Sequence, residues 1–169
     1  MTHIQLITQI KAAFAEVPKP YNHFGIYTAR AHDEYEEPTP EEQEWDRTLD
    51  RYDLTPQQMQ DCYTALDFLE PAGFHYYLPA YMILALQKDN IKDKALRDLI
   101  VFDSADFALT PASDADLRAY QEKRFGRLNG DQIQAILQYF RSRLASRSWN
   151  RKYYAEVIAY WEKRKEGDQ

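Results

Sequence analysis

The side chains that could do chemistry are few in this sequence and widely spaced. The histidines are His3, His23, His32 and His75, and there is one cysteine, Cys62. None of these residues forms an H-E-x-x-H motif or a Cys/His ligand spacing, so no metal site is predicted. The five glycines are isolated from one another, which excludes a glycine-rich phosphate loop, and no serine stands in a G-x-S-x-G elbow. No catalytic residue and no cofactor is therefore assigned.

Two residue combinations keep an enzymatic alternative open. His75 lies between Phe74 and Tyr76, and an imidazole beside tyrosine hydroxyls could relay a proton. His32 with Asp33 is the nearest approach to a set of metal ligands. The alternative function is a small hydrolase or metal-dependent enzyme, whereas a structural histidine and a solvated loop account for the same residues. Helical spacing places Cys62 in the core as a small buried hydrophobe.

Charge is strongly segregated along the chain, whose 169 residues carry a net charge of -6. Residues 31–70 hold 13 acidic and 2 basic residues, a net charge of -11, whereas residues 118–165 hold 12 basic and 4 acidic ones, a net charge of +8. Either these are two solvated faces, or the acidic segment steers a basic partner. In the basic half, Arg143, Arg147 and Arg151 are spaced to share one helix face, which gives the weaker alternative of nucleic-acid binding.

Hydrophobic periodicity predicts a mainly α protein, a single-domain bundle of about six or seven helices over residues 1–169. The first helix is expected behind Thr2 as N-cap, with Ile4 on its apolar face, and Leu117 and Tyr120 are expected to point inward from a later helix. A helix over residues 55–69 is expected behind the N-cap Thr55, with Tyr63 on its apolar face, and Asn129 is expected to start another in a capping box. Residues 18–40, which include four prolines, read as a long acidic connection. We expect at most one short extended segment. It would lie either in that connection, around residues 24–28, or at residues 99–102.

The stretch FLEPAGFHYYLPAYM, residues 68–82, has the most unusual composition in the chain. Its apolar residues recur at helical spacing, which predicts a helix facing the core. Pro79 either lies in the first turn of that helix, which would then begin near Tyr76, or kinks it. The residues expected to form this structural motif are Phe68, Pro71, Gly73, Phe74, Tyr77, Leu78, Pro79 and Tyr81.

This stretch resembles the central motif of an uncharacterised bacterial family, with the pattern F-x-x-P-x-G-F-x-Y-Y-L-P-A-Y. Residues 108–140 resemble the downstream half of the same family, and the similarity spans about residues 55–163. Ala72 and His75 stand where the family pattern has an acid and a base, so an ion pair built on these two positions is absent. The resemblance implies a small, soluble, mostly helical protein of unknown function and supplies no catalytic residue.

The leading functional hypothesis is a non-enzymatic, cytoplasmic protein-binding module. No run reaches the roughly 18 apolar residues of a membrane span, and a single cysteine suits a reducing compartment. Most concretely, we expect an immunity or inhibitor protein that occupies the basic cleft of a toxin or toxin domain, with Tyr35 and Trp45 as apolar anchors. The predicted partner-binding residues are Asp33, Glu34, Tyr35, Glu36, Glu37, Glu41, Glu42, Glu44, Trp45 and Asp46.

Overall fold

The structure, a computed structural model, describes residues 1–167 and is helical throughout its regular elements. Because these residues contain no strand, the mainly α class is confirmed, and neither of the expected extended segments forms. The helical segments are more numerous than the six or seven predicted, since several expected helices are interrupted. They pack as two compact units, residues 17–108 and residues 1–16 together with the chain from Leu109 onward. The prediction of a single domain stays a prediction.

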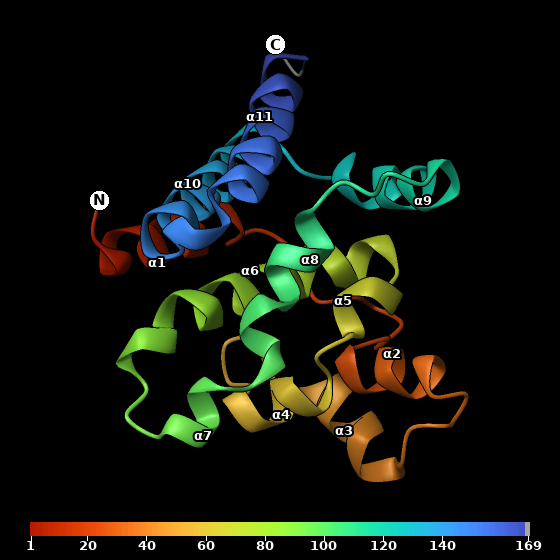
Figure 1. Cartoon of the computed structure of the whole chain (residues 1–169). Coiled ribbons are helices and arrows are strands. Elements are labelled where there is room, and N and C mark those ends of the chain that lie inside the picture. Colours follow the sequence, from red (N-terminus) through yellow and green to blue (C-terminus); the bar gives the residue numbers. More distant parts are fainter. Residues whose placement is uncertain (168–169) are drawn as a thin grey trace. The chain divides into compact units, whose positions relative to one another are not determined.

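The longest helix in the unit of residues 17–108 is α6 (Pro71–Gln87). Thirteen of its 17 residues are buried, so burial is not confined to one stripe of this helix, which is labelled in Figure 1. The other elements of this unit are α2 (Ile26–Asp33), α3 (Pro40–Thr48), α4 (Pro56–Asp61), α5 (Ala65–Phe68), α7 (Lys94–Arg97), α8 (Ser104–Leu109, which reaches the boundary) and the 3-10 helices η1 (Lys88–Asn90) and η2 (Ile100–Asp103).

The unusual stretch forms the start of α6. The helix begins at Pro71, earlier than Tyr76, and Pro79 lies inside it. Gly73 is required by close packing, because a Cβ there would lie 2.8 Å from the Leu69 side chain. One residue of the predicted motif does not fit the core: Phe68 is 41% exposed at the end of α5. The remaining members are buried or half-buried, as a structural motif requires.

Two predictions for this unit are corrected. The connection over residues 18–40 contains a helix, α2, where an extended piece was one of the options. Local sequence signals for α2 are weak, because its N-cap is Gly25, which has no side chain to cap the first turn. The single helix expected over residues 55–69 is split into α4 and α5, and Tyr63 between them is exposed rather than part of the apolar face.

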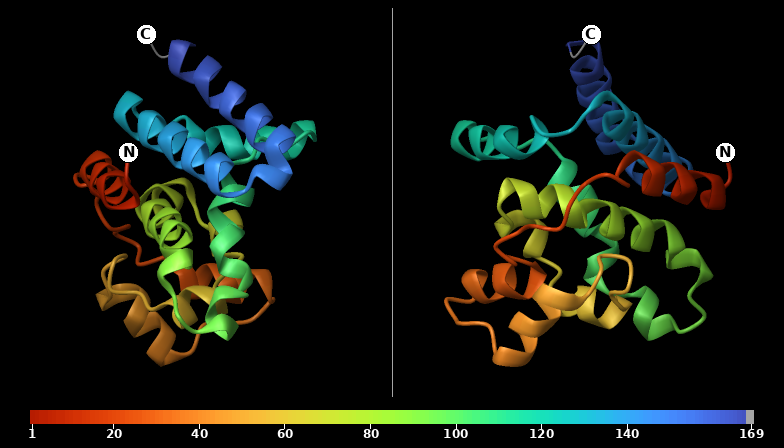
Figure 2. Two further views of the ribbon diagram at one scale, coloured as in Figure 1. Left: turned by 60° about the vertical axis from the view of Figure 1, so that its left-hand side comes forward. Right: turned by 180° about the vertical axis from the view of Figure 1, so that it is seen from behind.

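The second unit joins the two ends of the described chain. Its elements are α1 (His3–Ala13), α9 (Ala115–Phe125), α10 (Gly130–Ser146), the 3-10 helix η3 (Ser148–Asn150) and α11 (Arg151–Gly167). Helices α10 and α11 pack along each other, and α1 packs on α10 (Figures 1 and 2). The side-chain amide of Gln132 donates to the carbonyl of Ala13 at 3.1 Å and fixes α1 on α10.

The caps of this unit are as expected, but three apolar residues are not. Capping boxes begin α1 at Thr2 and α10 at Asn129. Ile4, Leu117 and Tyr120 were expected inside and are exposed. The buried residues of α1 are Leu6 and Ile10, which are four positions apart and therefore share one face of the helix. Ile4 lies outside this face.

Among the described residues, none of the helices combines the length and the apolar composition that a membrane crossing requires.

Candidate protein-binding surface

Helices α2 and α3 are joined by a tight turn, residues 34–39, which we call the acidic turn. Helix α2 ends in a Schellman motif, in which Tyr35 occupies the first position beyond the helix. The N–H of Tyr35 donates to the carbonyl of His32 at 3.3 Å, and the N–H of Glu36 donates to the carbonyl of Ala31 at 2.8 Å. The path of the turn is therefore fixed by hydrogen bonds to the helix.

Tyr35 sits on a backbone that favours glycine. Its φ of 56° lies in the left-handed region, which costs a residue with a side chain about 1 kcal/mol or more. The side chain is 99% exposed, so no packing within the chain offsets that cost. An exposed aromatic ring on an unfavourable backbone is costly for folding, and this combination is typical of a recognition residue.

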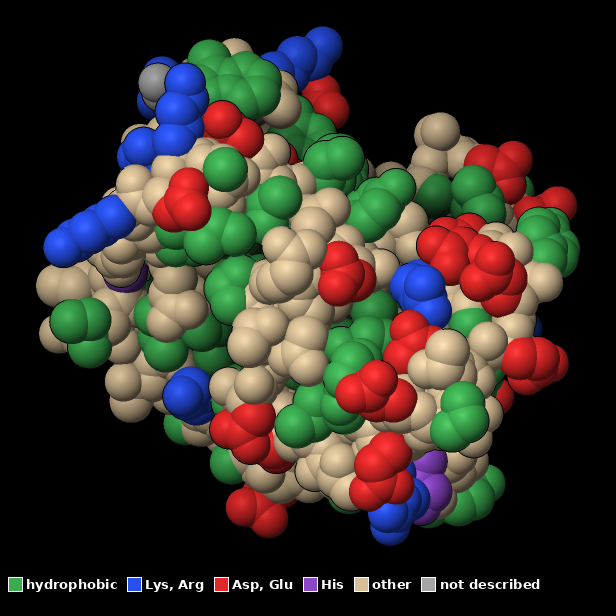
Figure 3. All heavy atoms as spheres, turned by 90° about the horizontal axis from the view of Figure 1, so that it is seen from below, with side chains coloured by type: hydrophobic (Ala, Val, Ile, Leu, Met, Phe, Trp, Pro, Cys, Tyr) green, Lys and Arg blue, Asp and Glu red, His purple; other side chains and the backbone are tan. Residues whose placement is uncertain are grey.

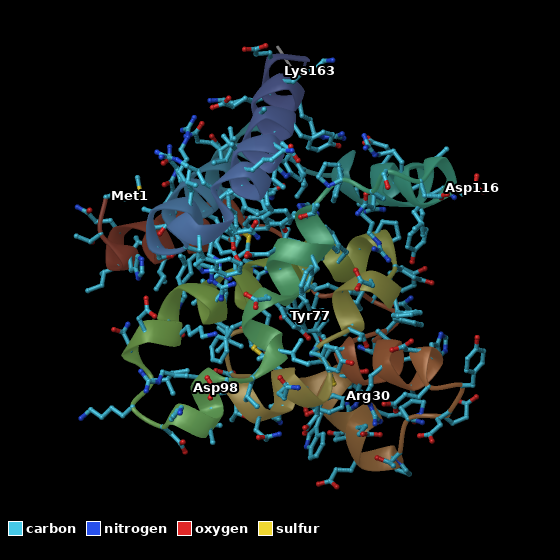
Figure 4. The ribbon with its side chains drawn as sticks, viewed as in Figure 1. Met1, Arg30, Tyr77, Asp98, Asp116 and Lys163 are labelled. Carbon is cyan, nitrogen blue, oxygen red and sulfur yellow. The ribbon has the colours of Figure 1, made fainter. Side chains whose placement is uncertain are left out.

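Arg30 ties the two sides of the acidic turn together (labelled in Figure 4). Its guanidinium donates to Glu34 at 3.0 Å and to Glu42 at 2.7 Å. Glu42 also accepts a hydrogen bond from the backbone N–H of Thr39 at 2.8 Å, which completes the capping box of α3. Because these contacts link the end of α2 to the start of α3, Tyr35 is held in place before any partner binds.

Asp46 fastens α3 to the other end of α2. It is 2% exposed, and it accepts hydrogen bonds from the backbone N–H groups of Tyr27 at 3.1 Å and Thr28 at 2.8 Å. The hydroxyl of Thr28 donates to the same carboxylate at 2.8 Å. Burial raises the pKa of Asp46, and the hydrogen bonds from Thr28 and Tyr27 oppose that shift. Asp46 thus caps the first turn of α2 from a neighbouring helix.

This arrangement corrects the prediction that Asp46 binds a partner, because its carboxylate is consumed inside the unit. The cap also requires glycine at the N-cap of α2. A Cβ on Gly25 would overlap the Asp46 carboxylate and would lie 2.8 Å from the hydroxyl of Tyr77.

Other predicted binding residues also have structural contacts. Asp33 accepts a hydrogen bond from the hydroxyl of Thr64 at 2.9 Å, and Glu44 forms an ion pair within α3. Trp45 is half-buried, with its ring centroid 5.0 Å from that of Tyr27. These contacts, with those of Glu34 and Glu42 to Arg30, leave fewer side chains open to a partner than the sequence suggested.

Four of the predicted residues are exposed and have side chains outside these contacts: Tyr35, Glu36, Glu37 and Glu41. Within residues 1–167 the three carboxylates take part in no hydrogen bond and no ion pair. Acidic side chains are spread over the face of the molecule that Figure 3 shows. The candidate surface is therefore the acidic turn with Glu41 beside it, an aromatic ring surrounded by unpaired negative charge.

The structure adds no support to the enzymatic alternative. His75 is half-buried on α6, and the exposed ring of His32 packs edge-on against Phe24 with centroids 5.0 Å apart. Among the described residues, no group of three or more His, Cys, Asp or Glu side chains could hold a metal ion. Burial raises the pKa of the Cys62 thiol, which keeps it protonated and unreactive.

The arginine stripe proposed for nucleic acid is not formed. Helix α10 ends at Ser146, Arg147 is its C-cap, and α11 starts at Arg151, so the three arginines do not belong to one helix. Arg143 is buried, with its guanidinium 5.9 Å from the centroid of the Tyr139 ring. The expectation of one shared face was wrong because it assumed an unbroken helix.

Sequence reasoning missed Arg30 and Thr28, which organise the candidate surface. Arg30 precedes Glu34 by four residues, and this spacing on a helix was the available signal for their ion pair. Thr28 had no such signal, because it meets Asp46 only through the packing of two helices.

The fold and this surface define an all-α protein whose most distinctive exposed feature is a charged turn with an aromatic tip. The chain belongs to a family of unknown function, DUF6714, whose family model matches residues 2–165. This match confirms the resemblance to an uncharacterised family. Neither the curated proteins nor the solved structures contain a match to the chain.

Proposed function

We propose that this protein is a protein-binding module that inhibits a basic partner, most concretely an immunity protein that neutralises a toxin in the cytoplasm. The observation that carries the proposal is Tyr35, a fully exposed ring held on a left-handed backbone by the end of α2. The neighbouring carboxylates supply a field that attracts a positively charged surface.

The roles of the two kinds of side chain differ. Unpaired Glu36, Glu37 and Glu41 raise the rate of encounter with a basic cleft, and this effect is screened by salt. Tyr35 enters the cleft and is desolvated there, which places it among the residues that dominate binding energy. Because the turn is preorganised by Arg30, little ordering has to occur on binding.

The test is protection by co-expression. Each product of the genes adjoining this one is expressed alone to find a basic protein that arrests growth, and is then co-expressed with this chain. We expect the wild-type chain to restore growth and the double variant E36K/E37K to fail. The purified pair should lose binding at least about tenfold in E36K/E37K and about 30-fold in Tyr35→Ala.

Matched controls separate the turn from general charge and exposure. The variant D89K/D98K makes the same charge change at two exposed acids elsewhere in the unit and should protect as well as wild type. Tyr21 is 93% exposed in another loop, so Tyr21→Ala should leave binding unchanged. Full protection by E36K/E37K, or the lack of any growth-arresting neighbour, would contradict the proposal.

A further inference from the structure

Another exposed aromatic ring, that of Trp149, lies in a turn of opposite charge. Trp149, in the connection between α10 and α11, is 79% exposed. We call residues 147–152 the basic turn. It lies within residues 132–155, a stretch that holds five basic residues and no acidic one.

Two of the three cations of the basic turn, Arg151 and Lys152, are open to solvent. They are the first residues of α11. The ammonium of Lys152 lies 4.0 Å from the carboxylate of Glu156, and both side chains are largely exposed, so water screens this pair strongly. A tryptophan beside accessible cations has the composition of a recognition hot spot.

We propose that the basic turn binds the acidic turn of a second copy of this chain. The two turns match in kind, since each presents one exposed aromatic ring, and they are opposite in charge. Tyr35 and Trp149 are both exposed in the single chain, so neither ring is covered by its own molecule. The segments 31–70 and 118–165 carry net charges of -11 and +8, which gives any two copies a long-range attraction between unlike parts.

The contact would be small and dependent on salt. Glu36 and Glu37 of one copy face Arg151 and Lys152 of the other, and an interface built from two turns falls in the size range of transient complexes. Because different surfaces meet, the contact is heterologous, and it forms open chains or rings unless two copies bind each other reciprocally. Added salt dissociates such a contact by screening the exposed charges.

This inference rests on the acidic turn being a docking surface, as in the proposed function, and it adds regulation of that surface. Two ligands that use one surface exclude each other. Self-association therefore keeps the acidic turn occupied until a partner that binds it more tightly displaces the second copy. Partner binding should therefore weaken as the concentration of the chain rises at low salt.

The experiment is sedimentation equilibrium of the purified full chain over a range of concentrations and salt. At low salt the average mass of the wild type should rise with concentration, and it should return to that of the monomer at high salt. E36K/E37K alone and R151E/K152E alone should each stay monomeric, because each then carries two turns of like charge. An equimolar mixture of the two variants should associate again, since unlike turns are once more available.

The controls separate a specific contact from general charge and from misfolding. D89K/D98K should associate like wild type, and Trp149→Ala should weaken association at least about tenfold. Circular dichroism must show that both charge variants are folded. A monomeric mixture of folded variants, or wild-type association of either variant alone, would overturn the proposal.

Three further outcomes are decisive. If the wild type stays monomeric at low salt but binds a labelled single-stranded oligonucleotide through Trp149 and Arg151, the basic turn serves nucleic acid and the proposal is wrong. If self-association fails while growth protection is lost in E36K/E37K, the proposed function stands without this regulation. If self-association is intact while the wild-type chain protects against no neighbouring product, the proposed function is wrong and the self-association stands.

Discussion

Tyr35 combines full exposure with a backbone conformation that glycine adopts at far lower cost. The Schellman hydrogen bonds that define its position are made by the backbone and do not need the phenol ring. Folding and recognition therefore make opposite demands on this residue, and substitution can separate the two.

Replacing Tyr35 with glycine should stabilise the fold. We expect the free energy of unfolding of Tyr35→Gly to exceed that of Tyr35→Ala by about 1 kcal/mol, because only glycine adopts the left-handed backbone without strain. Both variants should lose partner binding alike. Urea denaturation measures the free energy of unfolding of each variant. If Tyr35→Gly were less stable than the wild type, the ring would support the fold.

Removing the carboxylate of Asp46 should be costly. Asp46→Ala leaves the first-turn N–H groups of α2 unsatisfied in a buried site, which we expect to lower the free energy of unfolding by about 2–3 kcal/mol. Asp46→Asn keeps one oxygen and should lose less. Thermal denaturation of both variants checks the order, and equal losses would mean that the cap contributes little.

Asp46 also shows what sequence could not supply. Exposed acids surround it in the chain, and a composition argument placed it with them. Its burial depends on residues distant in the sequence: α3 packs on α2, and Gly25 has no side chain to occupy the space that the Asp46 carboxylate takes. By contrast, the caps Thr2, Thr55 and Asn129 were predicted correctly, because a capping box is complete within four residues.

Helices show the same division between local and distant causes. The starts of α1, α4 and α10 follow from their capping boxes, whereas α2 has no local start signal. In α6 the apolar residues predicted a helix, but the spacing alone could not show that 13 of its 17 residues are buried. Part of the candidate surface, the acidic and exposed aromatic residues, was visible in the sequence, and its organising contacts were not.

Glu122 docks α9 against α11. Its carboxylate accepts hydrogen bonds from Arg164 at 2.7 Å and from the hydroxyl of Tyr160 at 2.9 Å. Burial acts to raise the pKa of Glu122, but the hydrogen bonds from Arg164 and Tyr160 outweigh it, so that the pKa lies below its ordinary value. The carboxylate therefore stabilises the folded state only while it is ionised.

The variant Glu122→Gln should show this as a dependence on pH. At pH 7 we expect it to lose at most about 1 kcal/mol, since the ion pair is partly exposed and screened. The wild-type advantage is present above the unfolded pKa of about 4.3 and disappears as pH falls through the lower folded pKa. Urea denaturation at several pH values measures the difference. If the difference between wild type and Glu122→Gln persisted unchanged at low pH, the contribution of Glu122 would not come from its charge.

The molecule as a whole is divided into two compact units, one of which combines residues 1–16 with the chain from Leu109 onward. Whether the two units unfold together decides between one domain and two. Ile10, fully buried on α1, offers a way to perturb only one of them.

Ile10→Ala should lower the free energy of unfolding of its own unit by about 3 kcal/mol through lost packing. We expect native-state hydrogen exchange to show lower protection in α10 and α11, with α6 keeping its wild-type value. An equal loss of protection in α6 would show that the two units open as one cooperative domain.

The contact between α1 and α10 has a consequence for synthesis of the chain. Ala13 and Gln132, which are hydrogen-bonded, lie 119 positions apart, so at ordinary translation rates the first helix waits on the order of ten seconds for its partner. During that time Leu6, Ile10 and Phe14 have no α10 to cover them. The growing polypeptide therefore exposes the apolar face of α1 before α10 is made, and this face is a suitable target for a chaperone that acts on nascent chains.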